Sequence, residues 1–199
     1  MLHVNRGAFL ATKPYLPPLP EQRRIADILD RADALRAKRR AALARLDELT
    51  QAIFVETFGD PISNPKGWPT SKLLDVSEFE NGDRSSNYPS GDDVLEAGDV
   101  LFLNTRNITD GKMDLTSKAF ISKEKFNSIS RGKALFGDLI ITLRGTLGSC
   151  IIFDIEKQPA FINAQMMIIR PFNALNRAYL HALLTTDRMK AHFDRIGNG

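Results

Sequence analysis

The 199-residue sequence contains a single cysteine, Cys150, and no run of 18 apolar residues. One cysteine excludes a disulfide framework and is compatible with a reducing compartment. The lack of a long apolar run excludes a membrane-spanning helix, and residues 1–10, which include His3 and Arg6, lack the apolar region of a signal peptide. We therefore expect a soluble cytoplasmic protein with no membrane partner.

Motifs for catalysis are also missing. The sequence has no Gly-rich phosphate-binding loop ending in Lys-Ser/Thr, no Gly-x-Ser-x-Gly motif and no His-Glu-x-x-His motif. Its only Pro-Pro pair, at residues 17–18, does not belong to an Asn/Asp-Pro-Pro-Tyr/Phe methyltransferase signature. The three histidines, His3, His181 and His192, lack the spacing of metal ligands. The sequence thus predicts no catalytic residue, no metal site and no enzyme activity of its own.

Glycine and proline are absent from residues 21–56, where Ala, Leu, Arg and Glu dominate. Four prolines between residues 14 and 20 hold the preceding segment extended, so a helix is expected to begin near Pro20 or Glu21. Gly59 and Pro61 provide its stop signal. At a rise of 1.5 Å per residue, the helix predicted for residues 21–57 is roughly 55 Å long.

Apolar residues recur along this helix at alternating spacings of three and four, which is the a/d seam of a coiled coil. The seam consists of Ile25, Ile28, Ala32, Leu35, Ala42, Leu46, Leu49 and Ile53. Arg39 interrupts it, whereas Leu29 and Leu43 widen the stripe. The pattern favours a partner helix over the alternative, a long core helix within one globular domain.

The net charge of +3 is unevenly distributed. Residues 1–56 carry 10 Lys/Arg against 7 Asp/Glu, whereas residues 57–199 carry 17 of each. Within the second part, residues 75–99 hold eight acids and one arginine, and residues 112–133 hold six basic residues and two acids. A local basic face that meets phosphates is one interpretation, and ordinary solvated loops are the other.

Residues 58–199 predict a mixed α+β domain. Short apolar or β-branched runs bounded by turn residues predict strands at residues 100–104, 139–143, 150–154 and 166–170. Residues 178–196 have helical spacing. Gly137-Asp138 predicts a turn before a strand, and residues 144–148 predict a tight connection between two strands.

Loops at the ends of these strands carry side chains suited to reading DNA bases. Arginine matches guanine, asparagine matches adenine, and threonine meets a thymine methyl group or a phosphate. The candidate DNA-binding residues are Arg84, Asn104, Thr105, Arg106, Asn107, Lys118, Lys123, Arg144, Gly145 and Thr146. Structural alternatives stay open: Asn104 and Asn107 could cap turns, and Arg144 could pair with Asp138 or Asp154.

Two parts of the sequence resemble the specificity (S) subunits of type I restriction-modification systems. The run LPPLPEQRRIADILD at residues 16–30 continues through LRAKRR, LDELTQAIFVETFGDP and NPKGW, which is similar to the conserved helical region and its junction to a target-recognition domain. Downstream, FLNTRNITDGKMDL, ISKEKF and ALFGDLIITLRGTLGS are similar to the body of such a domain. The resemblance implies an α+β target-recognition domain preceded by a long coiled-coil-forming helix.

This resemblance also divides the chain into three parts. Residues 1–20 are expected to be a Pro-rich lead-in, the tail of a preceding recognition domain. Residues 21–57 are the conserved helix, a coiled-coil spacer. Residues 58–199 are a DNA target-recognition domain that we expect to be C-terminally incomplete.

The function implied is sequence-specific recognition of double-stranded DNA without catalysis. Modification subunits with S-adenosylmethionine would methylate adenine, and a restriction subunit with ATP and Mg would cleave, so the chain has no cofactor of its own. A homodimer through the long helix would rebuild the two-domain arrangement of the family. The alternatives are a fragment, a silent recognition-domain cassette, a coiled-coil adaptor without DNA binding, or a stand-alone DNA-binding regulator.

Overall fold

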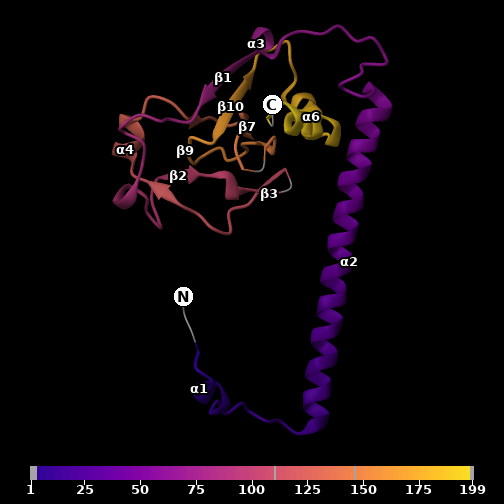
Figure 1. Ribbon diagram of the computed structural model, residues 1–199, viewed down its shortest axis with the longest axis vertical. Helices are drawn as coiled ribbons and strands as arrows, with labels where there is room; N and C mark the ends of the chain where they lie inside the picture. Colours follow the sequence, from indigo (N-terminus) through magenta and orange to yellow (C-terminus); the bar gives the residue numbers. More distant parts are fainter. Residues whose placement is uncertain (1–3, 110, 146, 198–199) are drawn as a thin grey trace. The chain divides into compact units, whose positions relative to one another are not determined.

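The computed structural model describes residues 4–109, 111–145 and 147–197. The chain divides into two units, residues 1–50 and residues 51–199. In the first unit a short helix, α1 (Arg6–Leu10), precedes the long helix α2 (Leu19–Phe58), whose last turns belong to the second unit (Figure 1). The predicted long helix is confirmed, with ends one or two residues beyond those expected.

Both ends of α2 have identifiable causes. Pro20 lies in its first turn, where the missing N–H costs no helical hydrogen bond. At the other end, Gly59 has a φ of +88° and donates its N–H to the carbonyl of Val55, which is the left-handed conformation that ends helices. Among the described residues, no helix has the length and apolar character needed to cross a membrane.

The second unit is an α+β domain, as expected, with two four-stranded sheets and one small hairpin. Sheet A has the order β1-β10-β7-β8 and is antiparallel, while sheet B has the order β5-β2-β9-β6 and pairs β2 with β9 in parallel. The strands are β1 (Ser77–Asn81), β2 (Val100–Leu103), β3 (Ile108–Thr109), β4 (Lys112–Met113), β5 (Phe120–Ile121), β6 (Lys133–Ala134), β7 (Leu139–Thr142), β8 (Cys150–Ile152), β9 (Ala160–Ile162) and β10 (Met166–Pro171). The helices are α3 (Leu73–Val76), α4 (Lys123–Ser128), α5 (Arg177–Leu184) and α6 (Asp187–Gly197), with 3-10 turns η1 (Gly91–Asp93) and η2 (Thr105–Asn107).

The alternation of side chains along the strands builds three cores. On β7, Ile140 faces the core between the two sheets, whereas Leu139 and Ile141 face α5. On β2, Leu101 and Leu103 join that central core, while the buried Val100 and Phe102 pack on the opposite face beside Phe126 of α4. β2 and β7 are buried on both faces, so their sequences are continuous apolar runs. All four strands predicted from such runs are confirmed.

The helix expected at residues 178–196 is wrong as a single element. The structure has α5 and α6 instead, separated at Thr185 and Thr186. The Thr186 hydroxyl donates to the carbonyl of Leu183 and accepts from the N–H of Met189, so one threonine both ends α5 and begins α6. Local hydrogen bonding of this kind overrides an apolar period that continues across the break.

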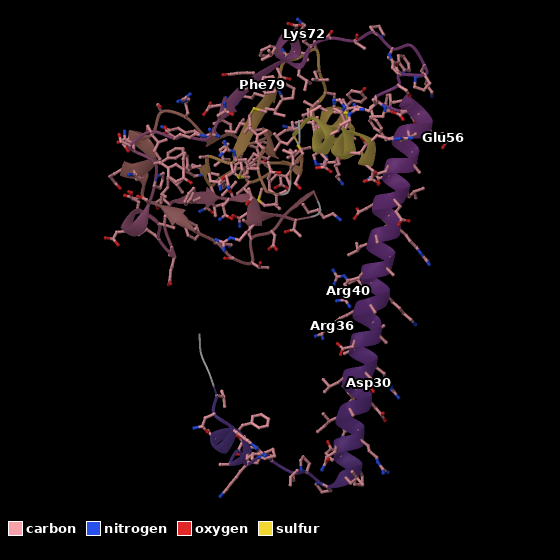
Figure 2. All side chains as sticks on the ribbon, in the orientation of Figure 1. Asp30, Arg36, Arg40, Glu56, Lys72 and Phe79 are labelled. Carbon is pink, nitrogen blue, oxygen red and sulfur yellow. The ribbon has the colours of Figure 1, made fainter. Side chains whose placement is uncertain are left out.

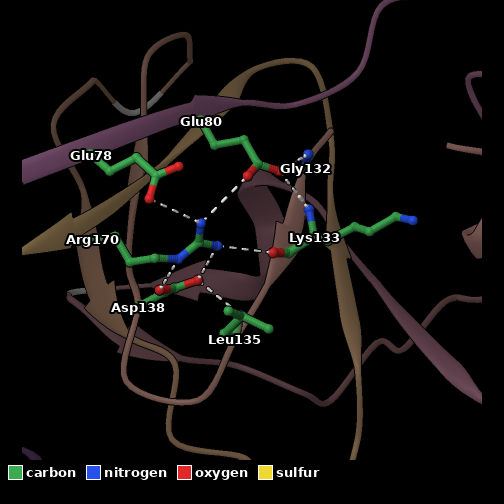
Figure 3. A network of polar contacts seen from close by, with 7 residues as sticks. All are labelled: Glu78, Glu80, Gly132, Lys133, Leu135, Asp138 and Arg170. Carbon is green, nitrogen blue, oxygen red and sulfur yellow. Dashed lines mark hydrogen bonds and ion pairs between the residues drawn. The ribbon is translucent and has the colours of Figure 1, made fainter. Parts of the chain in front are cut away.

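An ionic network joins the two sheets at one corner (Figure 3). Arg170 of β10 donates to both oxygens of Asp138, with Nε–Oδ1 and Nη2–Oδ2 distances of 2.8 and 2.9 Å. It also reaches Glu80 of β1 and the carbonyl of Lys133 on β6. Glu80 in turn accepts the Lys133 N–H, so one arginine links an edge of sheet A to an edge of sheet B. The Asp138 carboxylate holds the pKa of the Arg170 guanidinium above its ordinary value.

Candidate nucleic-acid interface

A single turn, residues 163–165, carries the chain from β9 in sheet B to β10 in sheet A. Because β2 and β9 are parallel neighbours, with Leu103 opposite Ile162, the segment after β2 emerges beside this turn. That segment is η2 and its cap Asn104, which contain four of the ten candidate residues predicted from the sequence. Parallel pairing thus places two polar loops at the same edge of sheet B.

Hydrogen bonds from three other segments fix the turn. The N–H of Asn163 donates to the carbonyl of Leu103 at 2.9 Å, and the Asn163 side chain accepts the N–H of Gln165 at 3.0 Å. The carbonyl of Gln165 accepts the N–H of Leu143, and that of Ala164 accepts Arg84 Nη2 at 2.9 Å. The loops that carry Arg84 and Arg144 therefore meet η2 around one turn.

Close packing beneath the turn depends on Gly82. A Cβ atom at this position would overlap the carbonyl group of Asn163, because the two backbones lie against each other. Only glycine allows this approach. The loop after β1, which leads to Arg84, is therefore fixed by shape as well as by hydrogen bonds.

The turn and η2 border a hollow of about 320 Å³. Its lining combines aromatic and apolar groups with amides and an arginine: Tyr88, Val94, Phe102, Asn104, Thr105, Arg106, Ala119, Asn163 and Gln165. Tyr88 meets the rings of Phe102 and Phe161 edge-on at centroid distances of 6.0 and 6.1 Å. Burial raises the pKa of the Tyr88 hydroxyl, so it stays a neutral hydrogen-bonding group at physiological pH. An apolar floor with a polar rim suits the face and edge of a nucleobase.

The candidate arginines differ in how many hydrogen bonds and ion pairs they form within the domain. Arg144 is exposed after β7, and no hydrogen bond or ion pair holds it among the described residues. Arg106 is exposed, with a weak contact of 3.4 Å from Nε to Oδ1 of Asn104. Arg84 is exposed, and its Nη2 donates a hydrogen bond to the carbonyl of Ala164 in the turn. Asp138, one of the two acids considered as a partner for Arg144, is bound to Arg170 instead.

The asparagines of η2 differ more sharply. Asn104 caps the turn, with its side chain accepting the N–H of Arg106, and it also lines the hollow. Asn107 is 3% exposed and donates both amide hydrogens, to the carbonyls of Asp114 and Ser117. This geometry argues against a contact between Asn107 and adenine, because both amide hydrogens are used in holding the loop.

The remaining candidates are spread around the domain. Lys118 is exposed and precedes Ala119, whose carbonyl pairs with Phe102 near the hollow. Lys123 begins α4 beyond Ile121, which lies opposite Val100 at the other end of β2, so it is not brought to the turn. Gly145 is exposed with a φ of +83°, and Thr146 lies outside the described residues. The described residues contain no group of three or more His, Cys, Asp or Glu able to hold a metal ion.

Six of the nine residues that line the hollow were not candidates from the sequence, and two of these six, Gln165 and Tyr88, matter most for binding. Gln165 is exposed at the turn and lines the hollow, and its Oε1 accepts a weak hydrogen bond of 3.4 Å from Asn163 Nδ2. Tyr88 provides the aromatic wall. Gln165 carries no functional signal in the sequence, because it is a single polar residue directly before a strand. Only the parallel pairing of β2 with β9 shows that it lies beside η2.

A buried carboxylate supports the loop that carries Arg84. Asp83 is 1% exposed and accepts hydrogen bonds from the backbone of Ser85 and the hydroxyl of Ser130. The hydrogen bond from the Ser85 side chain is the main cause that holds the pKa of Asp83 below its ordinary value. The acid is therefore a fixed anchor of the loop and does not present its charge to a polyanion.

The predicted seam of α2 is exposed in the structure. Among its members, Ile28, Leu35 and Leu46 expose 54%, 67% and 58% of their surface. Ile25, Ala42, Leu49 and Ile53 are exposed as well, and Ala32 is half-buried. These residues satisfy the geometric requirement for a helix-binding surface.

Comparison with known proteins relates the chain to one functional class. No protein-family model matches the sequence. The specificity subunit of the type I restriction enzyme MjaVIII from Methanocaldococcus jannaschii is 22% identical over 211 residues, covering 98% of this chain and 48% of the relative. The chain resembles type I specificity subunits. It spans about half the length of this curated relative.

Solved structures show the same S-subunit fold. The HsdS subunit from Thermoanaerobacter tengcongensis has a TM-score of 0.54 and 24% identity, covering 89% of this chain and 43% of that one. The type I S subunit from M. genitalium has a TM-score of 0.55 and 15% identity, with coverage of 89% and 44%. The expected architecture, a long helix followed by a mixed α and β domain, is confirmed.

Proposed function

We propose that this chain is a DNA-recognition module of a type I restriction-modification complex. Its second unit would read part of a double-stranded DNA target in the cytoplasm, and α2 would bind the rest of the complex. Partner modification subunits would supply S-adenosylmethionine and the adenine methyltransferase site, and a restriction subunit would supply ATP- and Mg-dependent cleavage. The chain itself would contribute no cofactor and no reacting group.

The observation that carries this proposal is the meeting of four loops, one of which is the turn of residues 163–165. Arg84, Arg106 and Arg144 come from three of these loops, and Gln165 projects from the turn itself. Guanidinium and amide groups are the donors and acceptors that distinguish base edges in a major groove. The scaffold beneath them is rigid, because each loop is hydrogen-bonded to the turn or to the strands on either side.

The decisive experiment combines the full chain with its modification subunit in cells. Long-read sequencing should reveal methylated adenine in a new motif only when this chain is present. We expect Arg144→Ala and Gln165→Ala to relax or abolish the motif while the domain stays folded. The Arg144 side chain makes no hydrogen bond or ion pair among the described residues, and that of Gln165 makes only a weak contact of 3.4 Å with Asn163. Lys157→Ala is the matched control, because Lys157 is exposed in the loop before β9, at the opposite end of that strand from the turn.

Binding measurements on the purified complex provide a second readout. Arg144→Ala should weaken DNA binding and lower the magnitude of the slope of log affinity against log salt by about 1 if Arg144 meets a phosphate. If it reads a base, the loss should instead depend on one position of the target, at about 1–3 kcal/mol. A complex that neither methylates a motif nor binds DNA would overturn the proposal and favour an adaptor or a silent cassette.

A further inference from the structure

The floor of the hollow beside η2 consists of side chains that largely pack against one another. Side chains of the second unit gather densely around its two sheets (Figure 2), and Phe102 of β2 belongs to this packing, with 8% of its surface exposed. Its ring centroid lies 5.4 Å from that of Phe161, and Tyr88 meets both rings edge-on. Little ring face is therefore left for a base to stack on, and the hollow offers more to the edge of a base than to its face.

The open part of the floor is aliphatic. Val94, which follows η1, exposes 39% of its surface, and Ala119 is half-buried. Both residues line the hollow with Phe102, and no described residue of the lining carries a carboxylate. A ligand group that covers these side chains gains free energy only if it is itself apolar, because burial of apolar area is what the floor can contribute.

The rim beside this floor carries amide groups that keep unused hydrogen-bonding capacity. Gln165 is exposed, its Nε2 has no partner among the described residues, and its Oε1 accepts only a weak hydrogen bond of 3.4 Å from Asn163. Asn104 differs, because its Oδ1 already accepts the N–H of Arg106 at 3.0 Å. An amide with both a donor and an acceptor available matches N7 and N6 of adenine in the major groove. Gln165 is therefore the better match for adenine.

The base-pair edges differ in what they would place against this floor. In the major groove thymine presents a C5 methyl group, whereas cytosine presents an amino donor. The methyl group would be buried against Val94 and Ala119. A cytosine amino group in the same place would leave water without gaining an acceptor from the aliphatic floor, which is unfavourable. The hollow thus combines an attraction for one base pair with a penalty against another, which is how binding sites become specific.

We propose that the hollow reads an A·T base pair of the target in the major groove. The thymine methyl group would lie on the floor beside Val94, and the adenine edge would pair with the amide of Gln165. Arg106, exposed at the rim, would be left to contact a phosphate or an adjacent guanine. This inference rests on the proposed DNA-recognition function and adds which base pair one part of that surface selects.

The test uses the purified complex of the full chain with its modification subunit, and duplexes that carry the motif found by methylation sequencing. Replacing one thymine at a time by deoxyuridine removes the C5 methyl group and keeps the hydrogen bonds of the base pair. We expect affinity to fall about fourfold at one thymine of the motif, because burying one methyl-sized group contributes about that factor. Replacing the paired adenine by 7-deazaadenine removes the N7 acceptor, and we expect a loss of about fivefold.

Two variants assign these effects to the hollow. Val94→Thr replaces a methyl group by a hydroxyl at nearly constant size, and should remove the difference between thymine and deoxyuridine at that position. Gln165→Ala should remove the effect of 7-deazaadenine and leave the deoxyuridine effect in place. Val76→Thr is the matched control, because Val76 is half-buried in α3, which precedes β1 at the end opposite to the loop of Arg84. Circular dichroism checks that the three variants stay folded.

The outcomes separate the A·T reading from the function on which it rests. A complex that binds its motif with no loss at any deoxyuridine position, or whose loss persists in Val94→Thr, would overturn the A·T reading and leave DNA recognition standing. A motif without an A·T pair would do the same. A complex that binds no DNA would overturn both. A loss that Val94→Thr removes and Val76→Thr retains would establish the thymine contact.

Discussion

Replacing Arg170 with alanine should destabilise the second unit severely, although the residue lies toward the end of β10 opposite to the turn of residues 163–165. The side chain of Asp138 is 3% exposed and receives two hydrogen bonds from the Arg170 guanidinium, in addition to one from the N–H of Leu135. In Arg170→Ala this carboxylate stays buried and keeps only the backbone donor. Leaving one member of a buried ion pair without its partner costs about 3–5 kcal/mol.

The effect should be visible in both urea and thermal unfolding followed by circular dichroism. For a unit of this size each kcal/mol lowers the melting temperature by about 2–4 °C, so we expect a decrease of roughly 6–20 °C. The double variant Arg170→Ala with Asp138→Ala should lose less than the sum of the single variants, because removing the acid removes the unpaired charge. Arg188→Ala is the control, since its ion pair with Asp60 is 72% exposed on the arginine side.

Two outcomes would refute this reasoning. A loss below about 1 kcal/mol in Arg170→Ala would mean that water or a rearranged neighbour replaces the guanidinium. Strict additivity of Arg170→Ala and Asp138→Ala would mean that the network seen in Figure 3 contributes no coupling energy. Either result would leave the packing of the central core as the main link between the two sheets.

Two further predictions concern residues of the same unit. Asn107→Ala should lower the free energy of unfolding by about 1–3 kcal/mol in urea titrations, because two backbone carbonyls lose their donor; unchanged stability with altered DNA specificity would show instead that the amide reads bases. Burial lowers the pKa of His181, so the unfolded chain binds its proton more readily and stability should fall as pH drops below about 6.5; His181→Gln should flatten that fall in urea titrations at several pH values, and an unchanged pH dependence would contradict the prediction.

The local features of this protein follow from its sequence because short-range physics decides them. Prolines before residue 21 and Gly59 bound α2 on each side, and the heptad spacing defines its seam. Two of the four expected strands, β2 and β7, are buried along their whole length and β8 and β10 are mostly apolar, so composition marks them. Short strands such as β3 and β4 have two residues each and leave no comparable pattern.

The tertiary structure decided which of the candidate residues lie together. Parallel pairing of β2 with β9 places Gln165 beside η2, although the two are some sixty positions apart in the sequence. Burial assigned Asn107 to the interior and left Arg144 at the surface, a distinction that two equally polar residues do not reveal in a sequence. Pairing between distant strands and competition for buried hydrogen bonds depend on the whole chain, whereas helix limits and strand periods depend on neighbours a few residues away.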